Sequence, residues 1–179
     1  MSGAWIFGYG SLVFRAGFAH RRSAPGWLDG FRRRLWQGSP DHRGTEAAPG
    51  RVATLVPEEG ARVLGVAFEV DRADLPEVLR VLDLREQAGY ERHDRPVTLL
   101  DGQVVEGIVY AAGPGNPSWL GPADPPVIAR HVAGAHGPSG PNREYVVRLA
   151  AVLRELGVES DEVLDVAAEL ERLELHHTG

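Results

Sequence analysis

"RPVTLLDGQVVEGIVYA" (residues 95–111) contains two apolar runs with β-branched residues, one on each side of Asp101 and Gly102. β-Branched residues favour strands, and an Asp-Gly pair between two strands favours a tight hairpin turn. The segment therefore predicts two neighbouring antiparallel strands, at 95–100 and 103–111. Such strands need only a short connection, whereas parallel neighbours need a crossover of a dozen or more residues.

Upstream segments show a similar pattern. Residues 62–70 (RVLGVAFEV) alternate as a strand does when one face packs on a core. The apolar side chains on that face are Leu64, Val66, Phe68 and Val70. The segment 51–56 (RVATLV) predicts another strand, and Pro-Glu-Glu-Gly at 57–60 predicts a tight hairpin loop between the two. Further strands are expected at 4–7 and 27–36.

Short turns, and not regular helical crossovers, connect these predicted strands. We therefore expect an α+β fold, a small and mainly antiparallel β-barrel with flanking helices. Helices are predicted where apolar residues recur every three or four positions: one starting near Asp71 and Asp74, one at 143–156, and one starting at Ser160. Two glycine- and proline-rich loops, 38–50 and 112–126, have the length of lids or binding loops, or of simply mobile segments.

Length and composition favour one soluble domain spanning residues 1–179. The chain is 43% hydrophobic, which is enough to bury one core. Its formal net charge of -6 argues against a nucleic-acid partner, because surfaces that bind a phosphate backbone are usually basic. There is no run of about 18 apolar residues and no signal-peptide pattern, which predicts a cytoplasmic protein without membrane association. Oligomeric state is not predicted.

Missing residue types exclude several kinds of chemistry. The chain has no cysteine, which excludes disulfides, thiolate nucleophiles and cysteine-based metal sites. It also has no lysine, which excludes Schiff-base chemistry and the lysine-phosphate contact of a P-loop. No spacing typical of metal ligands and no G-x-S-x-G hydrolase motif occurs. We therefore expect neither a metal nor a cofactor.

Glu86 is the candidate catalytic residue. It lies eleven residues after Leu75, close to the apolar stripe of its predicted helix and just before Gly89, which is expected to end that helix. Burial raises the pKa of a carboxyl group, to about 6 or 7 in a suitable site, where it can act as a general base. The alternatives are an ion pair with a nearby arginine, or a helix end exposed to solvent.

Three other side chains are candidates for a binding or catalytic site. Arg33 shares a strand face with Phe31 and Leu35, so it can bind a substrate carboxylate as a two-pronged donor; the alternative is a solvated arginine. Tyr145 lies on an apolar helical stripe, which is also where core tyrosines occur. His42 is a possible base, although loop histidines are usually solvated.

The turn Gly8-Tyr9-Gly10-Ser11 directly follows the first predicted strand. Its glycines allow the backbone to approach another group closely. The turn lacks the further glycine of a dinucleotide-binding fingerprint and the lysine of a P-loop. We therefore expect it to direct backbone N–H groups at an anion.

Seven sequence blocks resemble the ChaC-like γ-glutamylcyclotransferase family in order and spacing. They are FGYGSL at 7–12, RRLWQGSPDHRG at 33–44, PGRVATLV at 49–56, GVAFEV at 65–70, LDLREQAGY at 82–90, NPSWLGPA at 116–123 and GPSGPNREYVVRLA at 137–150. The resemblance extends from Trp5 to about Leu156, which is nearly the whole chain. It implies a small α+β barrel, consistent with the predicted hairpins.

The resemblance also implies an activity: conversion of the γ-glutamyl group of glutathione to 5-oxoproline, with release of cysteinylglycine. The glutamate of the R-E-x-x-G-Y block is the family's acid/base residue, and it corresponds to Glu86. The tyrosine of the N-x-E-Y block lies near the bound glutamyl group and corresponds to Tyr145. Substrate contacts are implied for the residues before and through the Y-G-S turn, namely Ile6, Phe7, Gly8, Tyr9, Gly10 and Ser11.

Three positions depart from the family pattern. Ala88 stands where a glycine is usual, Phe14 where tryptophan is common and Trp119 where tyrosine is common. These differences affect the shape of the pocket and not its proposed catalytic atoms. Two alternatives therefore stay open: a cyclotransferase for another γ-glutamyl amine or peptide, and a non-enzymatic module of the same fold that binds a small molecule.

Overall fold

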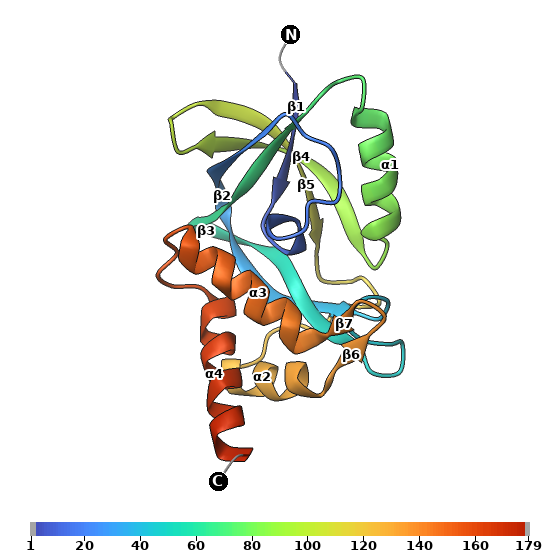
Figure 1. Ribbon diagram of the computed structural model, residues 1–179, viewed down its shortest axis with the longest axis vertical. Helices are drawn as coiled ribbons and strands as arrows, with labels where there is room; N and C mark the ends of the chain where they lie inside the picture. Colours follow the sequence, from blue (N-terminus) through green and yellow to red (C-terminus); the bar gives the residue numbers. More distant parts are fainter. Residues whose placement is uncertain (1–2, 178–179) are drawn as a thin grey trace.

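The protein, described here for residues 3–177 by a computed structural model, is built on a closed five-stranded barrel (Figure 1). The strands follow the order β1-β3-β2-β4-β5 around it. Their bounds are β1 Ala4–Gly8, β2 Arg22–Ser39, β3 Gly50–Val70, β4 Tyr90–Leu99 and β5 Val104–Ala112. All neighbouring pairs are antiparallel except β1 with β5. The predicted small, mainly antiparallel barrel is confirmed, as is the β4–β5 hairpin around Gly102.

The predicted hairpin loop at 57–60 is wrong. Residues 51–56 and 62–70 belong to one strand, β3, because both segments pair with β2 in the same direction: Arg32 pairs with Val56 and Leu28 with Val63. The turn-forming residues instead make an irregularity within the strand, where four residues of β3, 58–61, stand opposite Gly30 alone. Residues 40–49 make the true connection from β2 to β3.

Helices flank the barrel on two sides, as expected. Figure 1 shows α2, α3 and α4 gathered at one end, with α1 apart from them beside the strands. The three predicted helices are confirmed as α1 Leu75–Arg85, α3 Asn142–Glu155 and α4 Glu162–His177. Shorter elements are η1 Ser11–Val13, β6 His136–Gly137 and β7 Gly140–Pro141. None of the helices within residues 3–177 combines the length and the apolar character needed to cross a bilayer.

Helix α2 (Pro125–Gly134) is absent from the prediction, which treated 112–126 as loop and assigned nothing to the residues that follow. Asp124 precedes it at the N-cap, and Pro125 and Pro126 form its first turn. Proline is well suited to that position, since the first N–H groups of a helix have no partner within it. Asp-Pro-Pro at 124–126 is thus a signal for the start of a helix. It is hard to recognise because the loop before it is also rich in proline.

The core has two parts. The larger one fills the barrel and continues between α2, α3 and α4. The smaller one lies between α1 and the barrel, and includes Ile6, Leu12, Phe68, Val78 and Leu82.

Candidate active site

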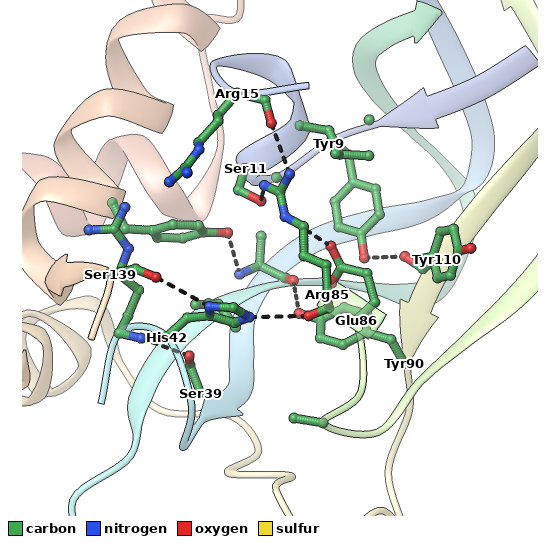
Figure 2. A pocket seen from close by; sticks show the side chains of 18 of the residues that line it. Tyr9, Ser11, Arg15, Ser39, His42, Arg85, Glu86, Tyr90, Tyr110 and Ser139 are labelled. Carbon is green, nitrogen blue, oxygen red and sulfur yellow. Dashed lines mark hydrogen bonds and ion pairs between the residues drawn. The ribbon is translucent and has the colours of Figure 1, made fainter. Parts of the chain in front are cut away.

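A cavity of about 310 Å³ opens where the end of β1, the end of α1 and the loop after β2 meet. Figure 2 shows polar side chains from these elements around it. The turn Gly8–Ser11 forms one wall, and Arg85 and Glu86 at the end of α1 form another. The remaining polar and aromatic side chains of the wall are Phe7, Phe14, Arg15, Ser39, Asp41, His42, Arg43, Tyr90, Tyr110, Ser139 and Tyr145. Within residues 3–177, no three histidine, cysteine, aspartate or glutamate side chains are grouped as metal ligands.

Two residues predicted to bind substrate, Ile6 and Arg33, are not among the residues that line this cavity. Ile6 is fully buried in the smaller core, because successive residues of β1 point to opposite faces and Phe7 takes the other one. Arg33 is also buried, and it is engaged inside the protein. Its Nε donates to the carbonyl of Tyr9 (2.7 Å), one Nη donates to Asp161 Oδ2 (2.7 Å), and the other to the carbonyl of Leu64.

Glu86 lies at the C-cap of α1, and its backbone N–H still donates to Leu82 O (2.8 Å). The side chain is largely buried, and this burial raises the pKa of the carboxyl above its ordinary value near 4.5. Arg85, whose Nε is 3.8 Å from Glu86 Oε1, opposes that rise, and so does His42. The predicted buried carboxylate and the alternative of an arginine ion pair are thus both present. The helical stripe brings the carboxylate into the cavity wall.

Arg85 ties the end of α1 to the turn after β1 (Figure 2). One of its Nη atoms donates to Ser11 Oγ (2.7 Å), and the other donates to the carbonyls of Arg15 (3.1 Å) and Ala16 (3.3 Å). Arg85 was not among the predicted site residues, although its position next to Glu86 was a signal. The contacts hold Glu86 and the turn in one arrangement.

His42, in the loop after β2, is about half-exposed and also forms part of the cavity wall. Its Nδ1 lies 3.2 Å from Ser139 Oγ, and its Nε2 lies 3.2 Å from the carbonyl of Arg85. A carbonyl only accepts, so Nε2 carries the hydrogen in this arrangement. The N–H of Ser139 donates to the carbonyl of His42 (2.9 Å), which fixes the loop from the other side. His42 therefore binds a terminal carbonyl of α1 and orders the residues next to Glu86.

The two glycines of the turn have different roles. A Cβ added at Gly8 would meet Leu12 Cβ at 2.7 Å, so Gly8 is required for η1 to pack against the end of β1. A Cβ added at Gly10 would instead lie 3.1 Å from the hydroxyl of Tyr145 and 3.5 Å from Ala53 Cβ. The missing side chain of Gly10 thus leaves room beside Tyr145 in the cavity wall.

Two tyrosine hydroxyls form hydrogen bonds with the backbone N–H and carbonyl of Ala53. Ala53 lies where the pairing of β2 with β3 is irregular. The N–H of Ala53 donates to Tyr145 Oη (2.9 Å), and Tyr90 donates its hydroxyl hydrogen to the carbonyl of Ala53 (2.6 Å). Burial raises the pKa of Tyr145 to about 12, so this hydroxyl stays protonated at neutral pH. Tyr145 therefore lines the cavity and also completes the sheet.

We expect Tyr145→Phe to lower the free energy of unfolding by about 1–3 kcal/mol, because the buried N–H of Ala53 loses its acceptor. Urea unfolding of the variant and the wild type measures the difference. Tyr110→Phe is the control, since it removes only a part-buried hydrogen bond to Asp83. A smaller loss for Tyr145→Phe than for Tyr110→Phe would contradict this account.

The raised pKa of Glu86 also predicts a pH dependence of stability. A carboxyl whose pKa is higher in the folded state contributes stability below its unfolded pKa, and this contribution is lost as pH rises through the folded pKa. We therefore expect Glu86→Gln, which cannot ionise, to gain stability relative to wild type as pH rises from 4.5 toward neutrality. Urea unfolding at a series of pH values tests this. Parallel curves for the two proteins would show that burial does not disfavour the Glu86 charge.

Comparison with known proteins gives consistent matches over most of the chain. The family model described as ChaC-like protein matches residues 4–173. Glutathione-specific gamma-glutamylcyclotransferase 1 of Danio rerio is 42% identical over 86% of this chain and 80% of its own length. The glutathione-specific gamma-glutamylcyclotransferase of Escherichia coli strain K12 is 33% identical over 94% of this chain and 73% of its own.

Solved structures match as well. The crystal structure of a γ-glutamyl cyclotransferase specific to glutathione from yeast superposes with a TM-score of 0.87 at 30% identity, covering 96% of this chain and 97% of that one. A structure described as gamma-glutamyl cyclotransferase, with a TM-score of 0.58 and 17% identity, covers 93% of this chain and 87% of its own and shares the fold.

Proposed function

The chain belongs to the ChaC-like family, and from this premise we propose that it is a glutathione-specific γ-glutamylcyclotransferase. One observation carries the mechanism: a buried carboxylate with a raised pKa, Glu86, lines a cavity of about 310 Å³ that the backbone turn Gly8–Ser11 also lines. This cavity suits a small-molecule substrate, and the two walls supply the proton transfer and the anion binding that the reaction needs.

The reaction is an internal displacement within glutathione. The α-amino nitrogen of the γ-glutamyl residue attacks its own γ-carbonyl carbon, and a new C–N bond closes the five-membered ring of 5-oxoproline. The amide bond to cysteine then breaks, and cysteinylglycine leaves with a free amino group. The nucleophile belongs to the substrate, so the protein has mainly to orient it and to move protons.

Glu86 carries the proton. As a carboxylate it removes a proton from the α-ammonium group, which makes the nitrogen nucleophilic, and it passes this proton to the departing amine of cysteinylglycine. The ring nitrogen loses its second proton to the carboxylate that is thereby restored, and this proton goes on to the product amine or to water. Its raised pKa places it closer to neutral pH, where one group can serve both as base and as acid. The nearby Arg85 guanidinium limits that rise and keeps the ionised form accessible.

The turn Gly8–Ser11 binds the γ-glutamyl group in this proposal. Gly10 is the N-cap of η1 and Ser11 is its first residue, so their N–H groups have no partner within that helix. Such N–H groups stabilise an anionic oxygen in a site with little water. Tyr145 and Phe7 flank the same cavity and complete its shape.

Purified protein incubated with glutathione tests the proposal, with γ-glutamylalanine in parallel and mass spectrometry of the products. We expect 5-oxoproline and cysteinylglycine in equal amounts from glutathione, and little 5-oxoproline from γ-glutamylalanine. A preference for γ-glutamylalanine would assign the protein to another γ-glutamyl substrate. No product from either compound would favour the non-enzymatic module.

A further inference from the structure

Arg33 connects the turn of the cavity to the C-terminal helix. Its side chain is 1% exposed and forms an ion pair with Asp161, which directly precedes α4. Its Nε donates to the carbonyl of Tyr9, in the turn itself, at 2.7 Å. Neither Arg33 nor Asp161 lines the cavity. A buried arginine with these partners holds the backbone of Tyr9 in place from behind the site.

The orientation of Tyr9 has a direct consequence for Gly10. Across a trans peptide bond, the carbonyl of one residue and the N–H of the next point in opposite directions. The carbonyl of Tyr9 faces Arg33, inside the protein, so the N–H of Gly10 points away from Arg33. Within residues 3–177 this N–H has no hydrogen-bond acceptor, and Gly10 lies in the cavity wall. The N–H is therefore free to bind an anionic group there.

Asp161 holds Arg33 in a fixed direction. One carboxylate oxygen accepts from Arg33 (2.7 Å), and the other accepts from the N–H of Val163 (2.9 Å) in the first turn of α4. The carboxylate is thus itself held by the helix. This second contact pre-orients the ion pair, because Asp161 cannot turn away without losing the cap of α4.

The next residue, Glu162, makes a separate attachment of α4 to β2. It accepts hydrogen bonds from the N–H of Leu35 (2.7 Å), from Arg34 (3.2 Å) and from the indole of Trp36 (3.2 Å). Within the described residues, no hydrogen bond joins Leu35, Arg34 or Trp36 to the turn Gly8–Ser11. Two adjacent carboxylates therefore anchor the start of α4 to β2. Only Asp161 is connected, through Arg33, to the turn that lines the cavity.

We infer that Arg33 and Asp161 are positioning residues, which hold the Tyr9–Gly10 peptide so that the Gly10 N–H is presented to the γ-carbonyl oxygen of the substrate. The part of this inference that concerns the substrate rests on the proposed function. The hydrogen bond from this N–H becomes stronger as negative charge develops on the γ-carbonyl oxygen in the transition state. Its contribution therefore appears in kcat more than in KM. The C-terminal helix thus supports a site that it does not touch.

Asp161→Asn and Glu162→Gln form a matched pair for the test. Each removes one carboxylate charge at the same end of α4 with little change of shape, and asparagine keeps a good N-cap. We expect both variants to lower the Tm. We expect only Asp161→Asn to lower kcat for glutathione, on the order of 10-fold with KM nearly unchanged, which is less than the 10²–10³-fold loss on removing such a donor altogether. Equal losses in both variants, no loss in Asp161→Asn, or a change in KM alone would overturn the inference.

A second measurement does not depend on turnover. The backbone amide signal of Gly10 in ¹H–¹⁵N NMR spectra is expected to shift in Asp161→Asn and to stay in place in Glu162→Gln. Arg33→Lys, which keeps the charge but cannot reach both partners, is the second variant if Asp161→Asn does not fold. An unmoved Gly10 signal overturns the positioning role, whatever the activity. A wild type that releases no 5-oxoproline would refute the proposed function, and the NMR result would still decide the positioning of Gly10.

Discussion

Replacing Glu86 by glutamine is expected to lower kcat for glutathione by about 10²–10⁴-fold, the usual contribution of a general acid–base group. Glutamine has nearly the same shape as glutamate, so it keeps the packing at the end of α1. It cannot take a proton from the α-ammonium group of the substrate. Release of 5-oxoproline measures the loss, and circular dichroism with thermal unfolding shows that the variant is folded.

Glu59→Gln is the control for this experiment, because Glu59 is exposed and lies outside the cavity. It removes the same charge and should leave kcat unchanged. If Glu86→Gln turned over glutathione at close to the wild-type rate, the proton transfer would belong to another group. His42, which also lines the cavity, would then be the first residue to change.

Replacing Gly10 by valine should lower kcat/KM by about 10²-fold, with both binding and turnover affected. The Cβ alone would lie 3.1 Å from the Tyr145 hydroxyl, which is already held by the N–H of Ala53. The two methyl groups of valine add further volume beside the space where the γ-glutamyl group is proposed to bind. Steady-state kinetics with glutathione measure the change.

Gly113→Val is the matched control. A Cβ at Gly113 would have nothing within 4 Å, and its backbone is not in the left-handed region. We expect this variant to behave as wild type in both stability and activity. Full activity of Gly10→Val would rule out the turn as the binding site for the γ-glutamyl group.

Local sequence signals predicted most of the architecture. The two strands around Gly102 and the helices α1, α3 and α4 follow from periodicity and turn residues that act over a few positions. The interpretation of Pro-Glu-Glu-Gly at 57–60 was wrong, because the same residues suit a chain reversal and an irregularity within a strand. Pairing of both flanks with β2, a long-range contact, decides between the two.

The candidate site residues also fall into two groups: those that local spacing predicts and those that only tertiary contacts place. Glu86 could be placed from its helical stripe, because burial along one helix face depends on spacing alone. Arg33 could not, since strand alternation says which face an arginine takes but not what lies on that face. Its partners Tyr9 and Asp161 are 24 and 128 residues away in the chain.

The sequence by itself determined most strands and helices, the exceptions being α2, η1, the small β6–β7 pair and the continuity of β3. Through its family blocks it also indicated the candidate carboxylate and turn. Only the tertiary structure decided which side chains share the cavity. Arg85, His42 and Ser139 come from the end of α1, the loop after β2 and the turn between β6 and β7, which the tertiary fold brings together at one cavity. Such contacts depend on the closed sheet as a whole, so no local pattern along the chain encodes them.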